Sequence, residues 1–123
     1  MRALIIEPDR ILANNLNTVL KAVGFETSVF YDPQLAVEDM DRQLPDIIIL
    51  ELQLAPISGV AFLYELRGYE DFSQVPVVIY SSVPKETFGL DEKQLNRLGI
   101  IKYFYKAKVS GQKVASFAKG ALV

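Results

Sequence analysis

The sequence predicts one α/β domain over residues 1–123, in which helices cover both faces of a five-stranded parallel sheet. Two observations carry this prediction. Short apolar runs alternate five times with segments whose apolar residues recur at helical spacing. One run, Ile47–Leu50, is too apolar for a half-exposed strand and indicates a central strand buried on both faces. Strands that alternate with helices are joined by right-handed crossovers, so the sheet is expected to be parallel.

The first unit joins a buried strand to an amphipathic helix. The strand covers Ala3–Ile6 and ends before Pro8, which interrupts the regular backbone. Asp9 is expected to cap the following helix with its side-chain oxygen. Apolar residues at helical spacing predict that helix over residues 12–23, and Gly24 ends it.

The second unit is less apolar and leads into the central strand. Residues 26–31 have mixed polarity, so we expect this strand nearer an edge of the sheet. Asp32 is a predicted N-cap, with Pro33 at the first position of a helix that extends to about Gln43. The central strand follows and ends at Glu51.

A third helix and a fourth strand follow the central strand. Ser58 is the predicted cap of that helix. The apolar face of the helix comprises Val60, Phe62, Leu63 and Leu66. A polar loop over residues 68–74 then leads to a buried strand, Val77–Tyr80, which ends at Ser81 and Ser82.

The last third of the chain contains two more helices and one more strand. Residues 83–89 are expected to be irregular, since Pro84 and Gly89 interrupt them. Asp91 is the predicted cap of a helix that extends through Leu98. The final strand covers residues 100–105 and ends at Lys106, and a final helix covers residues 109–122.

Composition excludes several kinds of chemistry. The chain has no cysteine and no histidine, which excludes disulfides, thiol catalysis, the usual zinc sites and histidine as a general base. A net charge of −2 gives no sign of binding to nucleic acid or to an anionic membrane. No apolar run is long enough for a signal peptide or a membrane span, so we expect a cytoplasmic protein.

Polar residues follow the ends of four predicted strands. The carboxyl ends of parallel strands meet at one edge of a sheet, where ligands of open α/β sheets bind. Acids, hydroxyls and a lysine at such an edge suit phosphoryl transfer to a carboxylate, with a divalent ion and the lysine offsetting oxygen charge. These residues are Glu7, Asp9, Glu51, Ser81, Ser82 and Lys106.

Several further marks are spread along the chain in a fixed order. They are the acidic cluster after the first strand, Pro45-Asp46 before the third, Gly59 eight residues beyond Glu51, Pro76 and Ser81 around the fourth, and Gly99, Tyr103 and Lys106 around the fifth. With these marks the whole chain resembles the receiver domain of two-component response regulators, and in particular single-domain chemotaxis regulators. The resemblance implies a flavodoxin-like (βα)5 fold with strand order 2-1-3-4-5.

The chain departs from the family at the phosphoacceptor, where Glu51 stands in place of aspartate. Glutamate is longer by one methylene, and a C–C bond is about 1.5 Å. Because an error near 1 Å can cost ~10²-fold in rate, attack on a donor aligned for aspartate is expected to be poor.

The magnesium pocket of the family also differs. The adjacent acids usual after the first strand become Glu7 and Asp9, separated by Pro8, and Asp9 is expected to turn away as a helix cap. Magnesium needs near-octahedral oxygen ligands. We therefore expect no dedicated metal site and at most weak magnesium binding by Glu7 and Glu51.

Two loops near this edge of the sheet depart from the family as well. The proline usual four residues after the acceptor is replaced by Ala55, with Pro56 one place later. Lys106 precedes Ala107 instead of proline.

Three functional residues of the family are retained. The resemblance implies that Lys106 pairs with the acidic pocket, that Ser81 is the switch hydroxyl and that Tyr103 is the switch aromatic residue. It also implies that the face of helix four, strand five and helix five binds a protein partner or forms a homodimer; that face includes Lys93, Arg97, Lys102, Tyr103, Lys113 and Lys119. A simpler interpretation treats Lys93, Arg97, Lys113, Lys119 and also Arg67 as charges on a solvated helix surface.

Three functions remain open from sequence. The first is a non-enzymatic, phosphorylation-independent signalling module, in which Glu51 is either a built-in mimic of the phosphorylated state, paired with Lys106, or a relic of a disused site. The second is an active receiver that takes a phosphoryl group from a kinase phosphohistidine with magnesium. The third, a small-molecule binder, ranks last because no Gly-rich phosphate loop follows the first strand.

Overall fold

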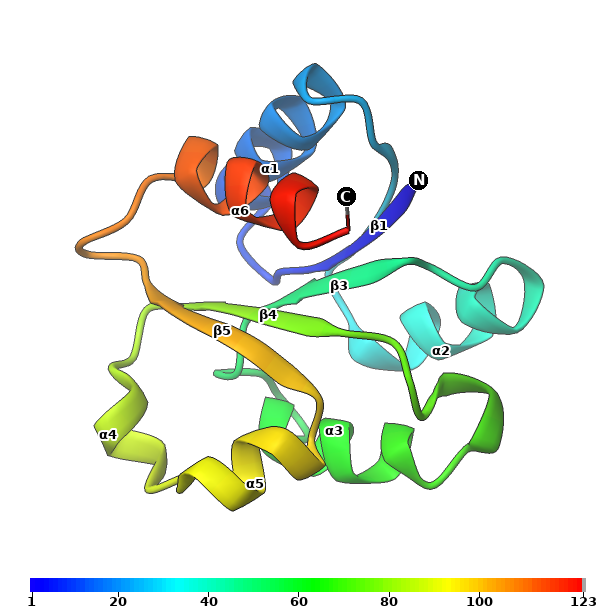
Figure 1. Cartoon of the computed structure of the whole chain (residues 1–123), viewed down its shortest axis with the longest axis vertical. Helices are drawn as coiled ribbons and strands as arrows, with labels where there is room; N and C mark the ends of the chain where they lie inside the picture. The colour runs from blue at the N-terminus through cyan, green and yellow to red at the C-terminus, as the bar shows by residue number, and fades with distance from the viewer. Residues whose placement is uncertain (123) are drawn as a thin grey trace.

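The computed structural model of the chain, described over residues 1–122, contains one five-stranded parallel sheet with the strand order β2-β1-β3-β4-β5 (Figure 1). The predicted fold class and strand order are confirmed. The elements are β1 (Arg2–Ile6), α1 (Arg10–Ala22), β2 (Glu26–Phe30), α2 (Pro33–Arg42), β3 (Ile47–Leu50), α3 (Gly59–Arg67), η1 (Glu70–Phe72), β4 (Val77–Ser81), α4 (Lys85–Phe88), α5 (Glu92–Arg97), β5 (Ile100–Tyr105) and α6 (Gly111–Ala121).

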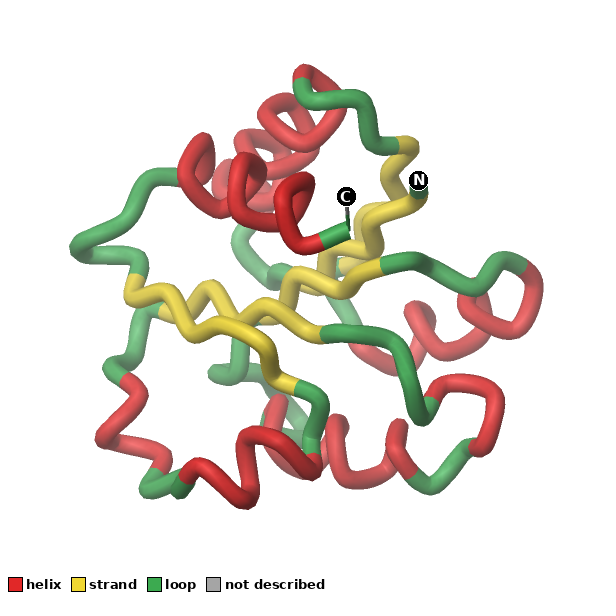
Figure 2. The backbone as a smooth tube through the Cα atoms, in the orientation of Figure 1, coloured by secondary structure: helices red, strands yellow, loops and turns green. Residues whose placement is uncertain are grey.

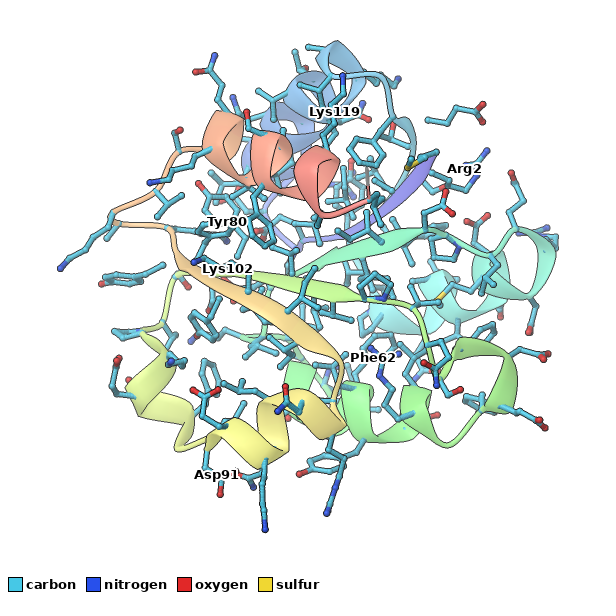
Figure 3. All side chains as sticks on the ribbon, viewed as in Figure 1. Arg2, Phe62, Tyr80, Asp91, Lys102 and Lys119 are labelled. Carbon is cyan, nitrogen blue, oxygen red and sulfur yellow. The ribbon has the colours of Figure 1, made fainter. Side chains whose placement is uncertain are left out.

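Helices cover the two faces of the sheet in two layers (Figures 1 and 2). Side chains of α1 and α6 pack on one face, and side chains of α2, α3 and α5 pack on the other. Alternate residues of each strand supply the two cores, so the four residues of β3 are all buried. Phe62, labelled in Figure 3, is a fully buried side chain between α3 and the sheet.

The four caps predicted from sequence are present. The carboxylate of Asp9 accepts hydrogen bonds from the N–H groups of residues 11 and 12 at the start of α1. Asp32, Ser58 and Asp91 likewise accept from the first turns of α2, α3 and α5. At α5, the Gln94 side chain also accepts from the backbone of Asp91, which completes a capping box.

The segment between β4 and α5 is more regular than expected. Residues 85–88, predicted as irregular, form the single turn α4. Gly89 then ends this turn with a φ of 63°, in the left-handed region that glycine adopts without a steric penalty. As a result, two short helices stand after β4.

Arg67 corrects a sequence-based interpretation, because it is not part of a solvated helix surface. The guanidinium of Arg67 is half-buried and donates to the carbonyls of Leu98, Phe72 and Val75, at 2.8, 2.7 and 2.6 Å. Gly99 has a φ of 72°, and a Cβ atom there would lie 2.3 Å from Nη2 of Arg67. Arg67 therefore ties the end of α3 to η1 and to the segment that enters β5.

No helix within residues 1–122 combines the length and the apolar character needed to cross a bilayer.

Candidate functional site

Strand register places Glu7 beside Glu51. Ile6 of β1 is paired with Leu50 of β3, so the next residue of each strand is an acid at the same level. The backbone N–H of Glu51 donates to the carbonyl of Ile6 at 3.0 Å, which extends the pairing by one step. Both side chains are buried, with only 3 % of Glu7 and 4 % of Glu51 exposed.

Lys106 supplies the positive charge between these two acids. Its backbone N–H donates to the carbonyl of Ser81 at 2.8 Å, which fixes the residue directly after β5. Its ammonium forms ion pairs with Oε1 of Glu7 and, at 3.0 Å, with Oε1 of Glu51. The ammonium also lies 5.8 Å from the ring centroid of Tyr80. Two buried carboxylates and one partly buried ammonium thus lie in contact, with a net charge of −1.

The carboxylate of Glu51 is engaged on both oxygens. Oε2 accepts a hydrogen bond from the backbone N–H of Gln53 at 3.0 Å. Oε1 accepts from the backbone N–H of Ser82 at 3.0 Å and lies 3.1 Å from the Ser82 hydroxyl, in addition to its contact with Lys106. The same hydroxyl is 3.1 Å from Oε1 of Gln53, and with a single hydrogen it donates to one of the two oxygens at a time.

These contacts favour the charged forms of Glu51 and Lys106. Burial raises the pKa of Glu51, but the N–H of Gln53, the nearby Ser81 hydroxyl, the N–H of Ser82 and the ammonium of Lys106 outweigh burial and lower it overall. Burial lowers the pKa of Lys106, but the two carboxylates outweigh burial and raise that pKa above its ordinary value. Both groups are therefore ionised at neutral pH.

The arrangement does not fit a magnesium ion. Oε1 of Glu7 is paired with Lys106, and its Oε2 accepts from the backbone N–H of Asp9 at 3.0 Å. Asp9, predicted both as a cap and as a member of the acidic pocket, is exposed and has its carboxylate on the N-terminus of α1. Among the residues that the structure describes, no three acidic side chains gather as a metal-binding group. The ammonium of Lys106 bridges the two buried carboxylates that an ion would need.

Ser81 and Ser82 have different roles. The buried Ser81 hydroxyl accepts a hydrogen bond from the backbone N–H of Val83 at 3.1 Å, which shapes the turn after β4. Ser82, which the sequence analysis placed at this edge of the sheet without a specific role, is the serine that donates to Glu51 through its N–H. Ser81 is paired with Tyr105, so Ser82 lies level with Lys106.

Tyr103 is connected to the same turn. Its hydroxyl donates to the carbonyl of Val83 at 2.5 Å, and its half-buried ring packs against Phe88 with ring centroids 6.4 Å apart. Burial raises the pKa of the Tyr103 hydroxyl. Glu51 and Tyr103 therefore bind the backbone of adjacent residues in one turn, at the N–H of Ser82 and the carbonyl of Val83 respectively.

A parallel sheet of this order, with buried acids and a lysine gathered at its carboxyl edge, is the architecture of receiver domains in two-component signalling. The response regulator receiver domain family matches residues 3–119, and the chain belongs to this family. It is 35% identical over 83 residues to the sensory transduction protein RegX3 of Mycobacterium bovis, a match that covers 68% of this chain and 35% of RegX3.

Other curated relatives are also longer than this chain. A protein-glutamate methylesterase/protein-glutamine glutaminase of Treponema denticola is 30% identical over 88 residues, which covers 70% of this chain and 23% of that enzyme. The matched part of the chain thus spans about a third or less of the length of these curated relatives.

Solved structures share the fold along the whole chain. A sensor protein from Polaromonas sp. JS666 superposes with a TM-score of 0.86 at 22% identity, covering 98% of this chain and 94% of that one. The chemotaxis protein CheY4 of Vibrio cholerae superposes with a TM-score of 0.83 at 12% identity, covering 99% and 98% of the two chains.

Proposed function

We propose that this receiver domain signals without phosphorylation, as a non-enzymatic module that acts through protein–protein contacts. One observation carries the proposal: the Glu51 carboxylate, in the place of the acceptor, binds Ser82 and Lys106, while the adjacent Val83 carbonyl binds the hydroxyl of Tyr103. The Glu51 carboxylate then supplies permanently the negative charge that phosphorylation adds at this position in active relatives.

The contacts of Glu51 support a working residue over a relic. A carboxylate without a role at the end of a strand is expected to remain in contact with solvent. Glu51 is instead almost fully buried and has four hydrogen-bond donors around its two oxygens. Burying a carboxylate costs free energy unless hydrogen bonds and counter-charges compensate it. The turn after β4 and Lys106 supply that compensation, so their positions depend on the charge of Glu51.

The same contacts disfavour phosphoryl transfer. A nucleophilic carboxylate must turn one oxygen in line with the donor, and here hydrogen bonds orient both oxygens, Oε2 toward Gln53 and Oε1 toward Ser82 and Lys106. The bridging ammonium also occupies the place between Glu7 and Glu51 in which a divalent ion would offset the charge of the donor.

Incubation with acetyl phosphate and magnesium, followed by intact mass measurement, tests the proposal. We expect no added phosphoryl group, while a receiver domain with an aspartate acceptor, treated in parallel, gains one. A stoichiometric, base-labile adduct on Glu51 would instead establish an active receiver that accepts phosphoryl groups from a kinase.

The output surface of the proposed module is the face formed by α4, α5, β5 and α6. Tyr103 lies on this face and is connected to the turn that Glu51 holds. The exposed basic side chains of these elements and of the loop after β5 are Lys93, Arg97, Lys102, Lys108, Lys113 and Lys119. We propose that this face recruits a protein partner.

A further inference from the structure

The net charge of the chain conceals a strong asymmetry. From residue 84 onward the chain carries eight basic and three acidic side chains, a net charge of +5, whereas residues 1–83 carry −7. Of those eight basic side chains, only Lys106 forms an ion pair within residues 1–122. The side of the molecule built from α4, α5, β5 and α6 therefore presents free positive charge.

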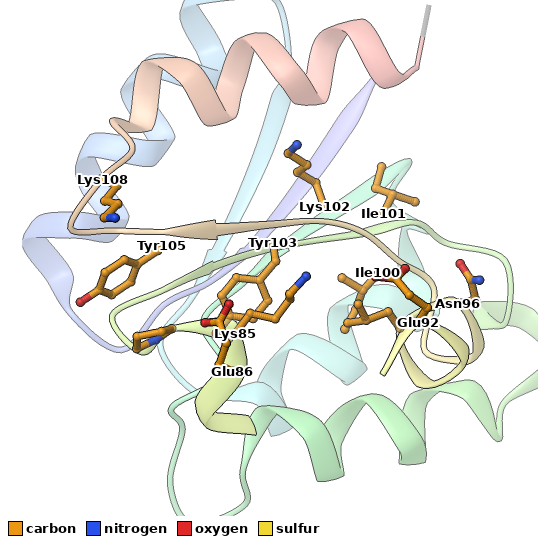
Figure 4. A pocket seen from close by; sticks show the side chains of 12 residues that line it. Lys85, Glu86, Glu92, Asn96, Ile100, Ile101, Lys102, Tyr103, Tyr105 and Lys108 are labelled. Carbon is orange, nitrogen blue, oxygen red and sulfur yellow. The ribbon is translucent and has the colours of Figure 1, made fainter. Parts of the chain in front are cut away.

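A groove runs along β5 on this side. It has a volume of about 830 Å³ and lies between the strand and the two short helices α4 and α5 (Figure 4). The successive residues 100–103 all line it. Because successive residues of a strand point to opposite faces, a groove that contacts four in a row must lie along the edge of the strand.

That edge of β5 is free. Within residues 1–122, β5 is the last strand of the sheet and pairs only with β4, so the backbone groups on its other side have no strand partner there. Ile101 stands on this edge with 45% of its surface exposed, at the irregularity in the pairing with β4. Lys102 and Lys108, both exposed, line the same groove, together with Lys85 of α4. Two acids, Glu86 of α4 and Glu92 of α5, also line it, so the charged side chains of the lining sum to +1.

We infer that the groove binds an extended acidic segment of a partner protein, which adds to the sheet as a strand beside β5. Backbone groups of β5 would supply the hydrogen bonds, Ile101 and Tyr105 the apolar contacts, and Lys102 and Lys108 the charge selection. The inference rests on the proposed function, since it identifies the partner that the output face recruits. Tyr103, which also lines the groove, connects the bound segment to the turn held by Glu51.

Selection of random dodecapeptides displayed on phage tests this inference with the whole chain as bait. We expect the enriched peptides to alternate acidic and apolar residues. Synthetic copies of them should bind at least tenfold more weakly to the Lys102→Glu/Lys108→Glu variant, and amide exchange in β5 should slow when they bind. The Lys21→Glu/Arg42→Glu variant, which changes two exposed basic residues of α1 and α2 outside both the groove lining and the output face, controls for net charge and should bind within twofold of the wild type.

Four results would overturn the inference: no enriched peptide, enriched peptides without acidic residues, equal binding by the groove variant, or exchange in β5 that does not slow. If a 20-base-pair DNA duplex bound more tightly than the peptides, the edge of β5 would be assigned to nucleic acid. If the chain self-associated and the groove variant abolished that association, the edge would be assigned to a second copy of the chain. Either result would also overturn the inference. Glu51→Ala separates this inference from the proposed function. If only the proposed function is wrong, Glu51→Ala binds the peptides like the wild type while the groove variant still loses them.

Discussion

The carboxylate of Glu51 contacts one residue, Ser82, twice: Oε1 lies 3.0 Å from its backbone nitrogen and 3.1 Å from its hydroxyl oxygen. Thirty-one positions separate the two residues in the sequence. The pair joins the end of β3 to the turn after β4, and the carbonyl of the next residue in that turn, Val83, accepts from Tyr103. The charge at the acceptor position is thereby connected to the output face through one turn.

The change in the free energy of unfolding caused by removing the Ser82 hydroxyl should depend on whether Glu51 is present. Ser82→Ala is expected to lower the free energy of unfolding by about 1–3 kcal/mol, the range for a hydrogen bond to a charged group. In the background of Glu51→Ala the same substitution should cost at least about 1 kcal/mol less, because its acceptor is gone. Urea denaturation of the four proteins measures this coupling. Ser116→Ala, on the exposed side of α6, is the control, and additive effects of the two substitutions would contradict the contact.

Loss of the Lys106 ammonium should be the most destabilising change in the crevice. Lys106→Met leaves Glu7 and Glu51 buried without a counter-charge, which is expected to cost about 3–5 kcal/mol at pH 7. Urea denaturation at pH 7 measures the cost. Lys108→Met, at an exposed position, should change stability by less than about 0.5 kcal/mol. Equal effects of the two variants would contradict the buried ion pairs.

Acid should destabilise the wild type more than the Glu51→Gln variant. The pKa of Glu51 in the fold lies below its ordinary value of 4.5, so the ionised side chain stabilises the fold above that pH. This contribution is lost as the pH falls through the lowered pKa. The free energy of unfolding, measured from pH 7 to pH 3, should therefore fall more steeply for the wild type. Parallel curves for the two proteins would show that the fold does not favour ionised Glu51.

Gly99 should tolerate a side chain less well than Gly89. Both have similar positive φ values, 72° and 63°, so Gly→Ala at either position introduces comparable backbone strain of about 1–2 kcal/mol. Only at Gly99 does the new Cβ meet Arg67, whereas nothing lies within 4 Å at Gly89. Thermal or urea denaturation should therefore show that Gly99→Ala costs at least about 1 kcal/mol more. Equal costs would mean that Arg67 moves away freely.

Sequence reasoning was most successful where the determinants are local. Asp9, Asp32, Ser58 and Asp91 were predicted as caps because a cap depends on the few residues that follow it. The strand order followed from the family resemblance. The one-turn helix α4 was missed because a single turn between Pro84 and Gly89 leaves no periodic pattern.

The finer contacts of the site depend on tertiary structure and could not be read from the sequence. Ser81 was selected as the switch hydroxyl by its position in the family pattern, and the serine within hydrogen-bond distance of Glu51 is its neighbour Ser82. Which serine reaches Glu51 is decided by the path of the turn after β4. Arg67 was assigned to the surface because its carbonyl acceptors come from η1, the loop before β4 and the end of α5.

Fluorine NMR of Tyr103 tests the central claim, that Glu51 without a phosphoryl group holds the turn after β4 and keeps Tyr103 bonded to Val83. The protein is labelled with 3-fluorotyrosine, and the signal of Tyr103 among the six tyrosines is identified with Tyr103→Phe. We expect that magnesium with beryllofluoride, a phosphoryl analogue, leaves the Tyr103 signal of the wild type unchanged, and that Glu51→Ala shifts it. A shift of the wild-type signal on addition of beryllofluoride, or an unchanged signal in Glu51→Ala, would contradict the claim.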